Sequence, residues 1–214
     1  MDGPAARASP RSQTGFTVAL CIVAAAAAGS IIAVSIAAYP ALEEGWRHAA
    51  RYTARFSFMI FLVVFVARPW HRIWPGRATR WTVLHRRALG LAFATAHFIH
   101  LYALTRFGLE SARVPTLSVL IGGAVAYVLL AAMVATSNDA SVRLLGMRNW
   151  TRLHTVGIYW IWFVFLKTYV LRVAAGHLFL VPFALAAVAA MALRLAAGVR
   201  RRSRAELGVT WGRA

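Results

Sequence analysis

Hydrophobic residues occur in long stretches along this chain, and charged residues gather between them. Six stretches are apolar enough to form membrane helices, over residues 15–39, 56–67, 88–105, 115–135, 153–171 and 173–193. About 20 apolar residues are needed to cross a bilayer core of about 30 Å. Because a helix satisfies its own backbone in lipid, the pattern predicts an all-α, polytopic bundle of six transmembrane helices.

The sequence also predicts where several of these helices begin and end. The second stretch, residues 56–67, reaches spanning length only if Arg51 and Arg55 join the helix and extend their charged ends outward. Pro115 suits the first turn of the fourth helix. Little more than residues 172–176 separates the fifth stretch from the sixth, which predicts a tight hairpin there, with His177 opening the sixth helix.

Arginine placement predicts the topology. Seventeen arginines fall before the first stretch, in the predicted loops 68–87 and 136–152, and from residue 194 onward, whereas six fall on the opposite side. Cytoplasmic loops carry the excess of basic residues, so both termini are predicted to be cytoplasmic. We therefore expect a leader over residues 1–14, a membrane domain over residues 15–197 and a basic cytoplasmic tail over residues 198–214. The leader resembles the start of a signal peptide, but the run after it is too long, which indicates an uncleaved anchor.

Composition excludes several classes of protein. The chain is 60% hydrophobic and 14% charged, unlike an average soluble domain. Its net charge of +18 does not indicate a nucleic-acid partner, because the arginines flank apolar runs and no aromatic-basic motif is present. The single cysteine, Cys21, permits no intramolecular disulfide and no cysteine metal site. The basic run at 200–204 fits an anchor near anionic lipid.

Four ionisable residues stand out inside the apolar stretches: His97, His100, His154 and Lys167. Such residues are costly in a bilayer and are functional candidates by default. His97 and His100 share one helix face at a spacing of three residues, so they face either a cofactor or hydrogen-bonding neighbours on other helices. His154 follows Arg152 closely, and its position alone favours an interfacial histidine.

Three segments resemble a known family when they are taken in order. They read TARFSFMIFLVVFVARPWHR before and through the second helix, RRALGLAFATAHFIHLYAL in the third and WTRLHTVGIYWIWFVFLK in the fifth. Together, residues 52–170 resemble the ferric reductase-like transmembrane domain family. The layout is most similar to the bacterial haem-binding subunit that supplies electrons to a periplasmic methionine sulfoxide reductase, which would place the chain in a bacterial inner membrane.

The resemblance implies electron transfer across the membrane through b-type haem. It assigns ligand positions to His100 in the third helix and His154 in the fifth. Two further positions, which hold histidine in the fullest family pattern, are occupied here by Arg86 and Lys167. Arginine keeps its proton and cannot ligate iron, whereas a buried lysine can lose its proton and become a ligand.

Depth along the helices makes His100 and Lys167 plausible partners across one haem, since each lies about 20 Å beyond the arginines that open its helix. On a straight helix, however, His154 and Lys167 would point about 140° apart. His97 offers another ligand from one turn away, or a hydrogen bond to a haem propionate, or it is only a polar neighbour.

Two functions stay open at this point. The chain is either a haem b electron carrier, reduced by quinol or a flavin-containing reductase and oxidised by a periplasmic partner, or a haem-free interaction or assembly subunit. In the second case Lys167 extends toward the outer interface. The sequence has no GxGxxG loop, so we expect no flavin or nucleotide to be bound by this chain alone. A transporter is less well supported, because no broken helix pair or repeat is visible.

Overall fold

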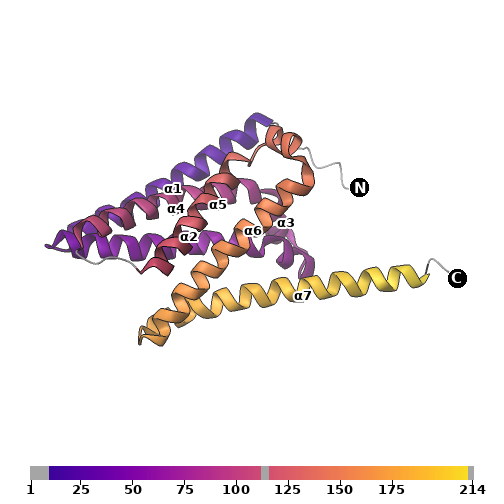
Figure 1. Cartoon of the computed structure of the whole chain (residues 1–214). Coiled ribbons are helices and arrows are strands. Elements are labelled where there is room, and N and C mark those ends of the chain that lie inside the picture. Colours follow the sequence, from indigo (N-terminus) through magenta and orange to yellow (C-terminus); the bar gives the residue numbers. More distant parts are fainter. Residues whose placement is uncertain (1–9, 112–115, 212–214) are drawn as a thin grey trace. The chain divides into compact units, whose positions relative to one another are not determined.

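The computed structural model of the chain describes the backbone of residues 10–111 and 116–211. Side chains are described within these ranges except at residues 10–12, 118 and 201–211. In chain order the helices are α1 (Pro10–Ala38), α2 (Leu42–Ile73), α3 (Arg77–Leu84), α4 (Arg86–Glu110), α5 (Leu117–Ala135), α6 (Asp139–Ala174), the 3₁₀ turn η1 (Leu178–Leu180) and α7 (Val181–Trp211) (Figure 1). No strand occurs in the described ranges, so the all-α prediction is confirmed.

Most of the apolar stretches of the sequence form long helices in the structure. Among the described residues, five helices are long and apolar enough to cross a membrane, within α1, α2, α4, α6 and the run from Leu178 to Arg200. The apolar part of α5, Val119–Ala135, is shorter. Arg51 and Arg55 do join α2, as the second span required. Pro115, predicted to open the fourth span, lies outside the described residues, as do most of the leader and the last residues of the tail.

Two compact units make up the chain. Unit 1 combines Met1–Phe61 with His85–Val114, and unit 2 combines Leu62–Leu84 with Pro115–Ala214. In unit 1, α1 packs along α4. A core of Trp46, Ala49, Ala50 and Ala103 packs against apolar residues of α1 and α4. Gly45 lets α2 approach α1 closely, because a Cβ there would lie 3.2 Å from the Ile36 Cα.

In unit 2, α5 and α7 each pack on α6. Three indole N–H groups of α6 donate hydrogen bonds to backbone carbonyls of these neighbours: Trp150 to Thr136 (2.9 Å), Trp160 to Gly122 (3.2 Å) and Trp162 to Ala187 (2.9 Å). Gly157 provides the room for close contact, because a Cβ on it would collide with the Met133 sulfur. Polar side chains therefore join helices whose apolar surfaces give little specificity of register.

The predicted boundary between the fifth and sixth spans is wrong in detail. The sixth span was expected to begin at Val173, but α6 continues to Ala174 and ends in a Schellman motif. In that motif the His177 N–H bonds the Arg172 carbonyl (3.0 Å) and the Gly176 N–H bonds the Val173 carbonyl (2.9 Å). Gly176 takes a positive φ of 90°, which glycine adopts without strain. His177, predicted to open the next helix, lies in this turn.

The two arginine-rich segments predicted as loops are largely helical. Residues 68–87 contain the end of α2 and all of α3, and residues 136–152 contain the first four turns of α6. Asn138 caps α6 by accepting the Ser141 N–H at 2.7 Å. Gly146 has non-helical dihedrals (φ 72°, ψ 149°) and interrupts this segment between Arg143 and Arg148. Basic flanks thus form helices of their own here, because arginine is a good helix former.

Candidate functional site

His97 and His100 lie on the side of α4 that packs against α2. The Nδ1 atom of His97 is 2.9 Å from the Ser57 hydroxyl, and the Nδ1 atom of His100 is 3.2 Å from the Thr53 hydroxyl. Thr53 and Ser57 are one turn apart on α2 and fully buried. The spacing of three on one helix and four on the other therefore sets up two parallel side-chain bridges between the helices.

The hydrogen-bond inventory indicates which nitrogen carries the proton. A hydroxyl has one proton to donate. The Thr53 hydroxyl is 2.7 Å from the Ala49 carbonyl, and the Ser57 hydroxyl is 3.0 Å from the Ala54 carbonyl, so each proton is used within α2. These distances favour Nδ1 of His97 and of His100 as the donor to the hydroxyl, with the lone pair of each ring on Nε2. This tautomer is the one that ligating histidines adopt when a neighbour holds their other nitrogen. His100 also forms a hydrogen bond with the backbone of Ala50.

Aromatic rings surround the pair on one side. Phe61 of α2 contacts Phe93 of α4 (ring centroids 5.3 Å apart), Phe93 stacks on His97 (5.2 Å), and His97 lies 5.3 Å from His100. His97 is 8% exposed, whereas His100 is half-buried. His100 is therefore the more accessible of the two imidazoles.

His154 has a different environment in unit 2. Its Nε2 atom is 3.2 Å from the Thr136 hydroxyl at the end of α5, and its ring stacks on Trp150 at 4.1 Å. The Thr136 proton goes to the Ala132 carbonyl (2.7 Å), so Nε2 of His154 is the donor. The nitrogen that usually binds iron is thus engaged with α5, and His154 would ligate only after leaving Thr136.

Lys167 lies on α6, in the same helical segment as His154. It is half-buried and makes no hydrogen bond or ion pair with any described residue. The helix between the two residues has regular dihedrals, because its non-helical residue, Gly146, precedes both. The predicted divergence of about 140° between them therefore holds for this helix.

The ligand positions fall into two sets. The structure brings His97 and His100 together in unit 1, and it places His154 and Lys167 in unit 2. Arg86, the other position that departs from the family pattern, is the first residue of α4. The pairing of His100 with Lys167 across a cofactor stays a prediction. Among the described residues, no group of three or more His, Cys, Asp or Glu side chains could hold a metal ion.

Sequence reasoning missed Thr53, Ser57 and Thr136, the hydroxyl partners of the three histidines. Thr53 and Ser57 stand one turn apart at the start of an apolar run, as a pair able to face histidines on another helix. That spacing was the available signal. The identity of the partner helix, however, follows from packing alone.

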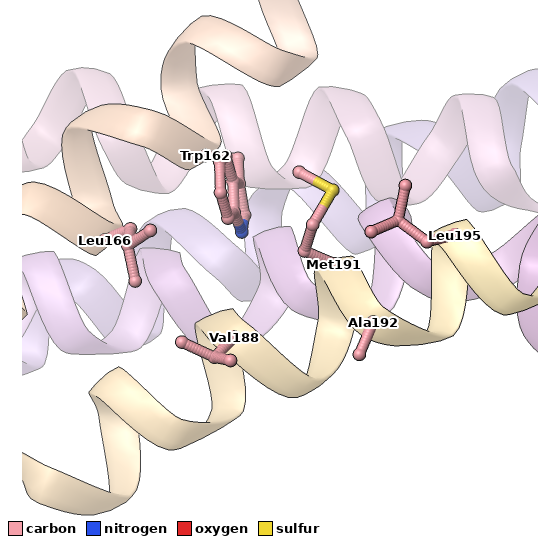
Figure 2. Close-up of a pocket in the computed structure, with 6 residues that line it drawn as sticks. All are labelled: Trp162, Leu166, Val188, Met191, Ala192 and Leu195. Carbon is pink, nitrogen blue, oxygen red and sulfur yellow. The ribbon is translucent and has the colours of Figure 1, made fainter.

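An apolar groove of about 270 Å³ runs between α6 and α7 in unit 2. Trp162 and Leu166 of α6 line it together with Val188, Met191, Ala192 and Leu195 of α7 (Figure 2). No titratable residue lines it. Its chemistry suits a hydrocarbon chain rather than a polar substrate, and all the residues that line it belong to unit 2.

No family model, curated protein or solved structure matches this chain significantly. The resemblance to the ferric reductase-like family therefore stays a prediction from the sequence motifs. What the chain can do must be argued from its own side chains.

Proposed function

We propose that this chain is a membrane electron-transfer subunit that holds haem b through His100. The observation that carries the proposal is the hydrogen bond between His100 Nδ1 and the Thr53 hydroxyl, whose own proton is used by the Ala49 carbonyl. This contact favours the tautomer of His100 with the proton on Nδ1 and the lone pair on Nε2. A neutral imidazole with its other nitrogen held in this way is a standard haem ligand.

Lys167 is the other candidate haem ligand that the family resemblance assigns. It lacks a hydrogen bond or ion pair with the described residues, and it lies in an apolar helix where a charged ammonium is costly. Loss of its proton would remove that cost and supply an amine lone pair. His154 fits the ligand role less well, because Thr136 engages its Nε2 atom.

The bound haem would supply a one-electron couple inside the membrane. The protein's own residues keep His100 in the ligating tautomer and exclude water by the apolar packing around Phe61 and Phe93. We propose that the chain crosses the membrane six times, with the five long spans joined by the shorter helix α5 as the fourth span in chain order. Both termini would lie on the cytoplasmic side of a bacterial inner membrane. A quinol or a flavin-containing reductase would donate electrons, and a redox partner on the outer side would accept them.

The test is an absorption spectrum of the purified protein, oxidised and dithionite-reduced, after expression with ample haem. The proposal expects a Soret band that His100→Ala abolishes. His177→Ala is the matched control, because His177 is exposed in the turn before η1 and should leave the band intact. Absence of a Soret band in the wild-type protein would end the proposal.

A haem-free interaction subunit is the second candidate, and one observation favours it. His97, His100 and His154 each have a hydroxyl partner within their own unit, so the fold accommodates all three imidazoles without a cofactor. On this reading the bridges join helices, and Lys167 extends to the membrane surface. The wild-type protein would then be stable and colourless, and His100→Ala would lower its stability without changing any spectrum.

A further inference from the structure

The short helix α3 exposes the wrong residues for a helix that faces water. Trp81 is 45% exposed and Leu84 is 68% exposed, whereas Thr79 and Thr82 are 5% and 8% exposed. A surface helix in water normally buries its apolar residues and exposes its hydroxyls. At 100° per residue, Arg77, Arg80, Trp81 and Leu84 fall within about 100° of one another, and the two threonines fall on the other side.

Local hydrogen bonds hold this orientation. The Thr79 hydroxyl accepts the Gly76 N–H at 3.0 Å and contacts His71 Nδ1 at 2.9 Å. It also lies 3.1 Å from the Trp74 carbonyl, to which it can donate. One side chain therefore ties α3 to the end of α2. The face with the arginines, Trp81 and Leu84 is turned outward as a consequence.

The position of α3 along the chain sets its depth. The apolar run of α2 ends at Ala67, and the helix ends at Ile73, about 9 Å farther at 1.5 Å per residue. The headgroup layers together add about 10–15 Å to a hydrocarbon core of about 30 Å. Each of the two layers accounts for about half of that thickness, or about 5–7 Å, so the turn before α3 falls near the outer limit of the headgroup layer. Trp74, in that turn, is 60% exposed, and tryptophan is enriched at this level of membranes.

The charge of the residues around α3 favours one kind of lipid. No Asp or Glu occurs between residues 45 and 109, whereas Arg72, Arg77 and Arg80 are all exposed around α3. Basic residues beside a membrane are attracted to anionic lipids. The exposed indoles and the leucine suit the boundary of the acyl chains, and the exposed guanidinium groups between them suit the phosphate layer of such a leaflet.

From this arrangement we infer that α3 and the preceding turn form a binding surface for anionic phospholipid. We define it by Arg72, Trp74, Arg77, Arg80, Trp81 and Leu84. The indoles and Leu84 insert into the headgroup layer toward the acyl chains, and the three guanidinium groups bind lipid phosphates. This surface does not depend on haem binding, since none of its residues is a candidate ligand.

Tryptophan quenching by brominated lipid tests the inference. The full chain would be reconstituted in phosphatidylcholine vesicles with either brominated phosphatidylglycerol or brominated phosphatidylcholine. The share of the tryptophan quenching that comes from this surface is the difference between the wild-type protein and the double variant Trp74→Phe/Trp81→Phe. We expect both lipids to quench this contribution, and phosphatidylglycerol to quench it at lower mole fraction. Arg77→Gln and Arg80→Gln should each lower the relative affinity for phosphatidylglycerol by up to about fivefold.

Two further variants make the result specific. Arg143→Gln/Arg148→Gln removes two exposed arginines of α6 and should leave the preference unchanged. Thr79→Val keeps every arginine but removes the hydroxyl that orients α3, so it should weaken the preference. Quenching equal for the two lipids, or no quenching of the Trp74 and Trp81 contribution, would overturn the inference. So would an equal loss in the α6 control.

Discussion

The guanidinium group of Arg194 donates a 2.7 Å hydrogen bond to the backbone carbonyl of Phe65. This carbonyl is the one that Pro69, four residues later in α2, cannot bond, because proline has no N–H. Arg194 also donates from Nε to the Tyr159 hydroxyl at 3.2 Å, and its guanidinium lies over the Phe65 ring at 4.3 Å. An arginine that the sequence analysis counted only as a topology signal is thus packed within unit 2, where it satisfies a carbonyl in a membrane helix.

Arg194→Leu should lower the free energy of unfolding by about 1–3 kcal/mol, because it leaves the Phe65 carbonyl without a partner. Denaturant titration in detergent micelles measures the change. Arg200→Leu, at an exposed position of the same helix, is the control and should be close to neutral.

Pro69→Ala should make Arg194 less important. Alanine restores the N–H that bonds the Phe65 carbonyl within α2, so Arg194→Leu should cost less in that background. A double-mutant cycle gives the coupling between the two positions directly. Strictly additive effects would mean that Arg194 acts through its ring contacts instead.

Thr53→Val should let the proton of the His100 ring occupy either nitrogen, whereas Thr53→Ser should keep it on Nδ1. Valine has nearly the same shape but cannot accept the Nδ1 proton. Nitrogen-15 chemical shifts of labelled histidine report the tautomer whether or not haem is present. A His100 signal that is protonated on Nε2 in the wild-type protein would contradict the ligand role proposed for that nitrogen.

Lys167→His should raise haem retention if Lys167 occupies a ligand position. Histidine binds iron without the cost of deprotonating a lysine. The ratio of Soret to protein absorbance after purification measures retention. Thr168→His, at the next and exposed position, is the control and should leave the ratio unchanged. Equal ratios in all three proteins would leave Lys167 as an interfacial anchor.

Gly157→Ala should separate α5 from α6, because the new methyl group would collide with the Met133 sulfur. Overpacking of this kind costs about 1–3 kcal/mol. Combining it with Met133→Ala should recover part of the loss, which thermal unfolding in detergent would show. A Cβ at Gly45 would meet the Ile36 Cδ1 atom at 3.1 Å and also the Ile36 Cα atom at 3.2 Å, so trimming the Ile36 side chain should relieve only part of the cost of Gly45→Ala.

The hydrophobic pattern alone determined the helical class and the position of the long helices. It did so because length and apolar content are properties of a continuous segment, and a membrane helix bonds its own backbone. Arg51 and Arg55 illustrate this, since their place in α2 followed from the length that a span requires. The same pattern misjudged the basic segments around α3 and the start of α6, because arginine-rich helices lack the apolar periodicity that marks a span.

Only the tertiary structure decided what the polar residues do. Thr53 and Ser57 look like ordinary helix residues until α4 packs beside them and their hydroxyls meet His100 and His97. Arg194 looks like a topology signal until α7 brings it to the carbonyl left open by Pro69. Hydrogen bonds between helices depend on packing across long sequence separations, and a one-dimensional pattern of polarity carries no record of that packing.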